Sequence, residues 1–137
     1  LTMGLSSRFP GQMIPMVTES IVSDGMVVIV GAADNACALP GGASPTVSLL
    51  GVIYRPDGSS AAVGDTVDVI ISGVYPVIAA GSITANNLIT SGGTDGTAIA
   101  ESAGSGVLVG VLGPALEDGV SGDRVATVIN PFIKQGA

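Results

Sequence analysis

Short apolar runs rich in β-branched residues alternate with turn-forming residues along most of the chain. Runs of this length and composition are typical of β-strands, and their spacing is that of a sandwich or barrel. The sequence therefore predicts an all-β fold, a small barrel or sandwich of about eight short strands. The predicted strands are Met26 to Val30, Val47 to Tyr54, Thr66 to Ser72, Val74 to Ile78, Asn87 to Ser91, Thr97 to Ala100, Gly106 to Leu112 and Arg124 to Asn130.

Three of the intervening segments are hairpin signals. Pro56-Asp57-Gly58, Gly92 to Gly96 and Glu117-Asp118-Gly119 each combine an acidic residue with a glycine that accepts positive φ. Helix is almost absent from the pattern, because only Ser82 to Asn86 could form a capped turn. We expect one helical turn at most.

An internal two-fold repeat is the most specific feature of the chain. Its copies span approximately 47–72 and 107–130. Each copy has a strand ending in Gly-Val, then an acidic turn, then a Gly-Asp pair that opens the next strand: Gly64-Asp65 in one and Gly122-Asp123 in the other. Two such β modules would close one small barrel or sandwich.

The second strand of each repeat copy is apolar on both faces. In the first copy Val67 and Val69 point one way, while Ile70 lies among polar residues on the other side. A strand with water on one face would alternate more cleanly. We therefore expect the outward side to be covered by a second sheet or a neighbouring subunit, or the strand to be central within the monomer.

The first 24 residues differ from the rest, because prolines are mixed with isolated large apolar residues. Pro10 and Pro15 exclude a regular helix and favour extended backbone. Two interpretations remain open: an extended N-terminal arm that grips a partner, or an ordinary first strand of the same domain. With the arm at 1–24, residues 25–137 would form a single β domain.

Charge is scarce, and this changes the expected context of the domain. Only 11% of the 137 residues are charged, against about 25% in an average soluble domain. A small domain exposes much of its surface, so part of that surface should be buried against other subunits. With four basic residues and a net charge of −7, the chain is not expected to bind nucleic acid.

Composition also argues against chemistry. The chain has no His, and its one cysteine, Cys37, can form neither an intrachain disulfide nor a multi-thiolate zinc site. Its acidic residues lie mostly in turns, where backbone bonding explains them. We expect no enzyme activity, catalytic residue, metal site, cofactor or small-molecule substrate. Polar residues and prolines also interrupt the uncharged stretch Val69 to Thr94 too often for a membrane span.

Several short segments together resemble the small capsid decoration, or cement, proteins of tailed bacteriophages. The resemblance covers roughly 51–131. Its segments include Leu49-Leu50-Gly51-Val52, Ala62 to Val69, Ser72-Gly73-Val74, Ala79 to Ala85, Thr94 to Ala98, Val109-Gly110-Val111 and Gly122 to Val125.

This resemblance implies a non-enzymatic virion protein, made in the host cytoplasm. Such proteins bind the outer surface of the expanded head as homotrimers and staple neighbouring major capsid proteins against internal DNA pressure. A closed trimer would also hide under-charged surface. We predict capsid contacts through the arm and a trimer interface on the repeat strands. The predicted capsid contacts are Arg8, Phe9, Met13, Ile14 and Met16, and the predicted trimer-interface residues are Ile70, Val128 and Phe132.

A second class of function remains open, namely a β-sandwich binding module of a secreted or cell-surface protein, such as an adhesin or carbohydrate-binding domain. The low charge of the chain and its abundant Ser, Thr and Gly would suit such a module. Against it stand the absence of Trp and the small number of other aromatic residues, two Tyr and two Phe, because aromatic side chains usually form the platforms for sugars.

Overall fold

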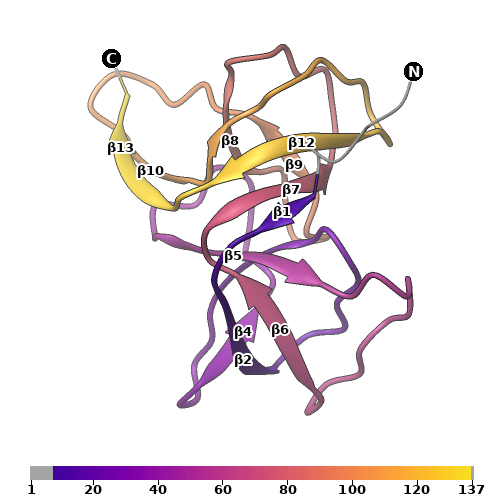
Figure 1. Cartoon of the computed structure of the whole chain (residues 1–137). Helices are drawn as coiled ribbons and strands as arrows, with labels where there is room; N and C mark the ends of the chain where they lie inside the picture. Colours follow the sequence, from indigo (N-terminus) through magenta and orange to yellow (C-terminus); the bar gives the residue numbers. More distant parts are fainter. Residues whose placement is uncertain (1–7, 137) are drawn as a thin grey trace.

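The computed structural model describes residues 8–136, which form thirteen short strands (Figure 1). This confirms the predicted all-β fold. The strands are β1 (Phe9–Pro10), β2 (Met13–Thr18), β3 (Val27–Val30), β4 (Ala36–Ala38), β5 (Leu49–Tyr54), β6 (Thr66–Ile70), β7 (Gly73–Ile78), β8 (Leu88–Ser91), β9 (Ala98–Ala100), β10 (Leu108–Val111), β11 (Gly113–Pro114), β12 (Arg124–Ile129) and β13 (Phe132–Gln135).

The first half of the chain closes into a five-stranded barrel in the order β2-β4-β3-β5-β6. All its pairs are antiparallel except β2 with β4, which run parallel at Val17↔Ala36 and Thr18↔Cys37. A bulge between Val28 and Ile29 shifts the register of β3 against β5. We call this barrel, residues 13–70, the first module.

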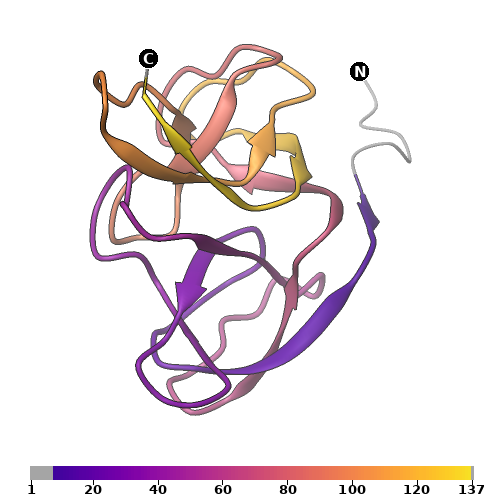
Figure 2. The same cartoon turned by 90° about the vertical axis from the view of Figure 1, so that its left-hand side faces the viewer.

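The second half repeats this arrangement. β7 pairs with β12, β8 pairs with β9 and β11, and single bridges at Ala79↔Ala98 and Ala115↔Thr127 join the remaining neighbours. The resulting ring, β7-β9-β8-β11-β12, follows the strand order of the first barrel, including one parallel contact. We call residues 73–129 the second module. The internal repeat therefore extends over nearly the whole described chain, and Figure 2 shows the two modules as lower and upper lobes.

Equivalent turns in the two modules have the same geometry. Gly64 and Gly122 adopt φ of 94° and 90°, a region that disfavours other residues. The aspartate after each glycine accepts a 2.9 Å hydrogen bond from the backbone N–H three residues earlier: Asp65 from Ala62, and Asp123 from Val120. The Gly-Asp signal in the sequence therefore marks the entry to β6 and β12.

Residues 8–136 contain no helix, which agrees with the expected limit of one helical turn, and the stretch Ser82 to Asn86 is not helical. A third turn of the same type lies there instead. Asn86 adopts φ of 78°, and the side chain of Asn87 accepts a 2.8 Å hydrogen bond from the N–H of Thr84. The asparagine pair therefore takes the part that Gly-Asp takes in the other two turns.

A shared core joins the modules. One apolar cluster fills the second module and continues into outward-facing residues of the first, among them Leu49, Val52 and Ile70. A smaller cluster around Val28, Ile53 and Val69 fills the first barrel. The outward side of β6 is therefore covered by the second half of the same chain, which settles the question left open by its apolar pattern.

The N-terminal strands run along both modules. β1 and β2 lie antiparallel to β7 and β6 in one continuous register, from Phe9↔Val74 to Val17↔Thr66 (Figure 2). Residues 9–18 of the predicted arm are thus strands of the fold, the alternative that the sequence left open; residues 1–7 lie outside the described part. We call 9–18 with 66–74 the N-terminal ribbon.

Candidate functional surfaces

One face of the N-terminal ribbon exposes mainly apolar side chains. The odd-numbered residues point outward: Phe9 is 55% exposed, Met13 38% and Val17 41%, and Pro15 is also exposed. Side chains alternate between faces along a strand, so these residues form a single stripe across both modules. We call Phe9, Met13, Pro15 and Val17 the ribbon stripe. Contiguous exposed apolar surface of this kind is typical of an interaction site.

Pro15 fits the strand because of its edge position. The N–H of Val17 donates to Asn35 in the direction of β4, whereas the N–H of Thr18 donates to Asp65 in the direction of β6. Pro15 shares the parity of Val17, so its missing N–H falls on the side away from β6, where β4 does not reach. Proline costs no ladder bond at such an edge and also discourages unwanted strand pairing.

The structure divides the predicted capsid contacts between two faces. Phe9 and Met13 lie on the exposed stripe, whereas Ile14 and Met16 point inward and pack on the core of the first barrel. Both side chains are partly buried, so they offer a partner on the outer face less surface than Phe9 and Met13 do. Arg8 lies over the Tyr75 ring, with its guanidinium carbon 5.5 Å from the ring centroid.

The three predicted trimer-interface residues also differ. Ile70 is fully buried under the second module and could meet another subunit only if this core opened, which corrects its predicted place. Val128 is partly exposed, and Phe132 is exposed on β13. The error arose because the outward face of β6 is covered within the chain rather than by another chain.

A second exposed apolar surface surrounds Gly110 and was missed by the sequence reasoning. Val47 is 51% exposed, and Leu108 and Ile133 are each 49% exposed. Ile133 pairs directly with Gly110, and the carbonyl oxygen of Val47 lies so close that a Cβ on Gly110 would stand 2.1 Å from it. The run Val107 to Leu112, which has no polar side chain on either face, could have drawn attention to this region.

A buried carboxylate links the modules next to the ribbon. Asp24 accepts hydrogen bonds from the Tyr75 hydroxyl at 2.8 Å, the Arg55 backbone N–H at 2.8 Å and Arg124 Nη1 at 3.1 Å. Burial, followed by the bond to Asp24, raises the pKa of the Tyr75 phenol above its ordinary value. Tyr75, Arg55 and Arg124 all donate to Asp24, so we interpret this cluster as a structural link between the modules, which we call the Asp24 tie.

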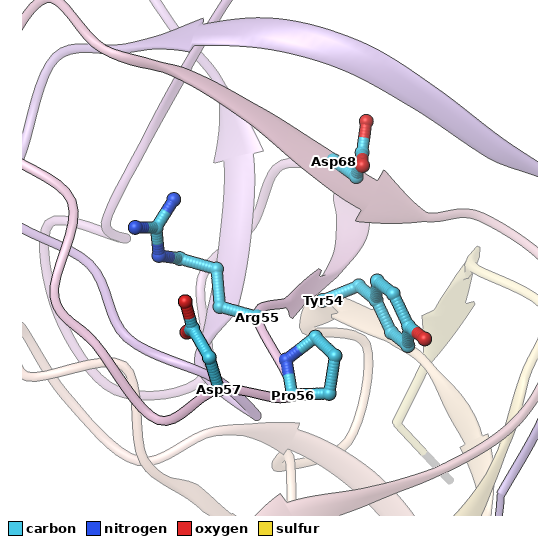
Figure 3. Close-up of a pocket in the computed structure, with 5 residues that line it drawn as sticks. All are labelled: Tyr54, Arg55, Pro56, Asp57 and Asp68. Atoms are coloured by element: carbon cyan, nitrogen blue, oxygen red, sulfur yellow. The ribbon is translucent and has the colours of Figure 1, made fainter.

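A shallow hollow of about 240 Å³ lies beside Tyr54 and is also lined by Arg55, Pro56, Asp57 and Asp68 (Figure 3). Arg55 and Asp57 lie at one end of the hollow, with Pro56 between them and Tyr54. Both charged groups bind Ser59, Arg55 at its carbonyl and hydroxyl and Asp57 at its N–H and hydroxyl. Arg55 and Asp57 stabilise the turn after β5 through these bonds, which account for both charged groups without a ligand.

Other signs of chemistry are sparse in the part of the chain that the structure describes. Residues 8–136 contain no group of three or more His, Cys, Asp or Glu side chains placed to hold a metal ion. The Cys37 thiol is buried, and burial raises its pKa. Over the same residues, no helix has the length and apolar character needed to cross a membrane.

Comparison with known proteins adds one finding. No family model matches the chain, and no curated protein matches it. Among solved structures, the chain is similar to the N base of head fiber gp8.5 in bacteriophage phi29, with a TM-score of 0.58 and 21% sequence identity. The match covers 87% of this chain and 93% of that chain. At this identity the likeness establishes the architecture: the chain has the fold of the base of a phage head fibre.

Proposed function

We propose that this chain is a structural protein of a phage head. It binds the outer surface of the expanded capsid as a trimer and stabilises the contacts between neighbouring major capsid proteins. The observation that carries the proposal is the fold shared with the N base of a phage head fibre over most of both chains. The sequence segments that resemble capsid decoration proteins point independently to the same place in the virion.

The ribbon stripe is the surface that we assign to the capsid. It offers apolar contact along both modules, and residues 8–18 contain only one charged side chain, Arg8. Burying a large apolar side chain that was half exposed contributes about 1 kcal/mol. One stripe would therefore bind weakly, whereas three stripes on one trimer would bind together and raise the overall affinity through avidity.

The shape of the ribbon suits a role in stapling. Its register joins the first module to the second without interruption, so a force on one module is shared with the other through the β1–β7 and β2–β6 ladders. The shared core and the Asp24 tie add to this connection. A rigid pair of modules can hold two capsid subunits at a fixed separation, which a flexible tether could not do.

Binding to isolated heads tests this proposal. Purified protein is mixed with expanded and unexpanded heads of the phage that encodes it, and bound protein is measured by co-sedimentation. We expect saturable binding to expanded heads. Phe9→Asp together with Met13→Asp should weaken it by at least about 100-fold, since burying two carboxylates and losing two apolar contacts costs about 3 kcal/mol or more.

A matched control separates a local effect from added charge. Val120 is 59% exposed in the turn before β12 and is not part of the stripe, so Val120→Asp should bind heads like the unmodified protein. Failure of the unmodified chain to bind expanded heads would refute the proposed function. Full binding by the double variant would refute the ribbon stripe as the contact surface.

A further inference from the structure

Strand β13 is an open edge of the fold over residues 8–136, where β10 is its one sheet partner. The Gly110 N–H donates to the Pro45 carbonyl, on the side of β10 away from β13. Bonded and non-bonded pairs alternate along an antiparallel ladder, so Gly110 and Ile133 form a non-bonded pair. The backbone N–H and C=O groups of Ile133 and Gln135 therefore point outward, and no backbone group of 8–136 bonds to them.

The internal repeat provides a reference for this edge. β13 follows β12 as β7 follows β6, in each case after a two-residue link. Counted from the Gly-Asp turn that opens β6 or β12, Tyr75 corresponds to Ile133 and Val77 corresponds to Gln135. The two residues with open backbone groups on β13 are therefore equivalent to two residues inside β7.

On β7 this equivalent edge is occupied by β12. Val125 pairs with Val77, and Thr127 pairs with Tyr75, in an antiparallel ladder. The carbonyl of Ala126, which lies between them, accepts a bond from the segment after β11 on the opposite side of β12, so the Val125 and Thr127 pairs are the bonded ones. An antiparallel strand thus satisfies on β7 the backbone groups whose counterparts are open on β13.

Burial shows the same contrast between the two strands. Tyr75 and Val77 are fully buried, whereas Ile133 is 49% exposed and Gln135 is also exposed. Phe132, on the opposite face of β13, is 39% exposed. A strand added along β13 would therefore cover apolar surface on both faces, while its backbone satisfied the open N–H and C=O groups.

Two common forms of protection against strand addition do not operate on β13. Proline at an edge position prevents pairing, as Pro15 does on β2, and a lysine extended into solvent discourages it. β13 contains no proline. Its lysine, Lys134, binds the carboxylate of Glu101, whose side chain is 4% exposed, so the ammonium group is tied to the fold.

The fold argues against a second copy of this chain as the partner. In another copy, β12 is already paired on both sides, with β7 and with the segment after β11, and Pro15 interrupts the free edge of β2. Two β13 strands would satisfy both Ile133 and Gln135 only in the antiparallel register that sets Lys134 opposite its copy. Like charges directly opposite each other destabilise a ladder.

We propose that β13 accepts an antiparallel strand from a different protein, and that this strand is an extended, uncharged segment rich in β-branched residues. β12 is the model for it, because its residues 125–129 have this composition and occupy the equivalent edge. Backbone hydrogen bonds to Ile133 and Gln135 hold the segment, and its alternate side chains pack beside Ile133 and Phe132. The inference depends neither on a trimer nor on the ribbon stripe.

A peptide with the sequence of residues 124–130, acetylated and amidated at its ends, is the probe. Amide hydrogen exchange of the unmodified chain is measured by NMR with and without this peptide. We expect saturable binding with a Kd below about 1 mM. The amides of Ile133 and Gln135 should exchange at least several-fold more slowly in the complex, because each would donate to the added strand.

Two N-methylated forms of the peptide are the matched controls. The Thr127 N–H faces the partner strand on β7, whereas the Ala126 N–H faces away from it. A methyl group on the Thr127 nitrogen should therefore weaken binding at least about 10-fold, since it removes one hydrogen bond and blocks close approach. A methyl group on the Ala126 nitrogen should leave the Kd within about three-fold of that of the unmodified peptide.

A pair of chain variants tests the same edge from the other side. Ile133→Pro removes a donor that the β10 ladder does not use, so the variant should keep its circular dichroism spectrum. Ile133→Ala shortens the same side chain and keeps the donor. The proline variant should bind the peptide at least about 10-fold more weakly than the alanine variant. Should the proline variant fail to fold, the N-methylated peptides make the comparison on the unmodified chain.

Three results would overturn the inference: no saturable binding of the peptide, equal binding of the two N-methylated peptides, or slower exchange at Tyr75 and Val77 in place of Ile133 and Gln135. The last result would mean that the peptide replaces β12. Slower exchange of the Ile133 and Gln135 amides at high protein concentration without peptide would assign the edge to a second copy, and would also overturn the inference.

Discussion

Replacing Asp24 by alanine should loosen the connection between the modules. Asp24 is 4% exposed and accepts hydrogen bonds from Tyr75, Arg55 and Arg124. Its loss leaves the fully buried Tyr75 hydroxyl without its acceptor, at a cost of about 1–3 kcal/mol, and the Arg55 N–H adds about 1 kcal/mol. Arg124 is partly exposed and can turn to water. We expect a total loss of about 3 kcal/mol in the free energy of unfolding.

Asparagine at position 24 provides a graded comparison. It can keep one oxygen for Tyr75 and Arg55 and replaces only the oxygen that faces Arg124, so Asp24→Asn should cost about 1 kcal/mol. The chain has no Trp, so urea unfolding is followed by circular dichroism. At this chain length, a loss of about 3 kcal/mol corresponds to a fall of about 10 °C in Tm.

Asp34→Ala is the control for the Asp24 series, because Asp34 is an exposed carboxylate in the turn between β3 and β4. It should change the free energy of unfolding by no more than about 0.5 kcal/mol. If Asp24→Ala were equally mild, the carboxylate would not stabilise the fold and the reasoning would be refuted. Broad or two-step unfolding of Asp24→Ala alone would mean that the tie makes the two modules unfold together.

Three further predictions concern other parts of the fold. The hydrogen bond from Lys134 lowers the pKa of Glu101 in the folded state. The ionised Glu101 carboxylate therefore contributes fully to stability above the ordinary pKa of 4.5, and this contribution is lost as the pH falls through the folded-state pKa. Glu101→Gln should accordingly flatten the decrease in the urea midpoint below about pH 5. Gly110→Ala would force a Cβ against the Val47 carbonyl and should destabilise by about 2 kcal/mol, unlike Gly41→Ala, whose Cβ meets nothing within 4 Å. Asp65→Ala and Asp123→Ala remove equivalent turn bonds and should each cost about 1 kcal/mol in urea unfolding; a difference above that amount would contradict their equivalence.

Local pattern was sufficient to predict much of the fold. Each of the eight predicted runs overlaps an observed strand, because β-branched runs between turns reflect local preferences. The Gly-Asp turns were recognised for the same reason. The strands that were missed, such as β4 and β13, are short or carry weak signals. For β2 the sequence left an arm and a first strand open, because proline usually opposes strand pairing; that objection does not apply at an unpaired edge.

The surfaces were harder to predict, because exposure depends on what lies across a strand. Ile14 and Ile70 are as apolar as Phe9 and Leu108, yet the first two are turned into the fold and the last two into solvent. Sequence alternation indicates that two faces exist but does not identify the face that another module covers. The placement of Ile70 failed on this point, since the missing cover was in the same chain.

Once the structure is known, the internal repeat helps to identify which face of a strand is covered. The two modules have the same strand order and the same turns, so each position in one module is a built-in reference for its equivalent in the other. Pro15 is exposed on the stripe, whereas its equivalent Pro76 is buried; Ile70 is fully buried, whereas its equivalent Val128 is partly exposed. The fold alone would treat the members of each pair alike. Their differences therefore mark the places where the chain meets itself and the places where it is free to meet another molecule, and both free places are apolar.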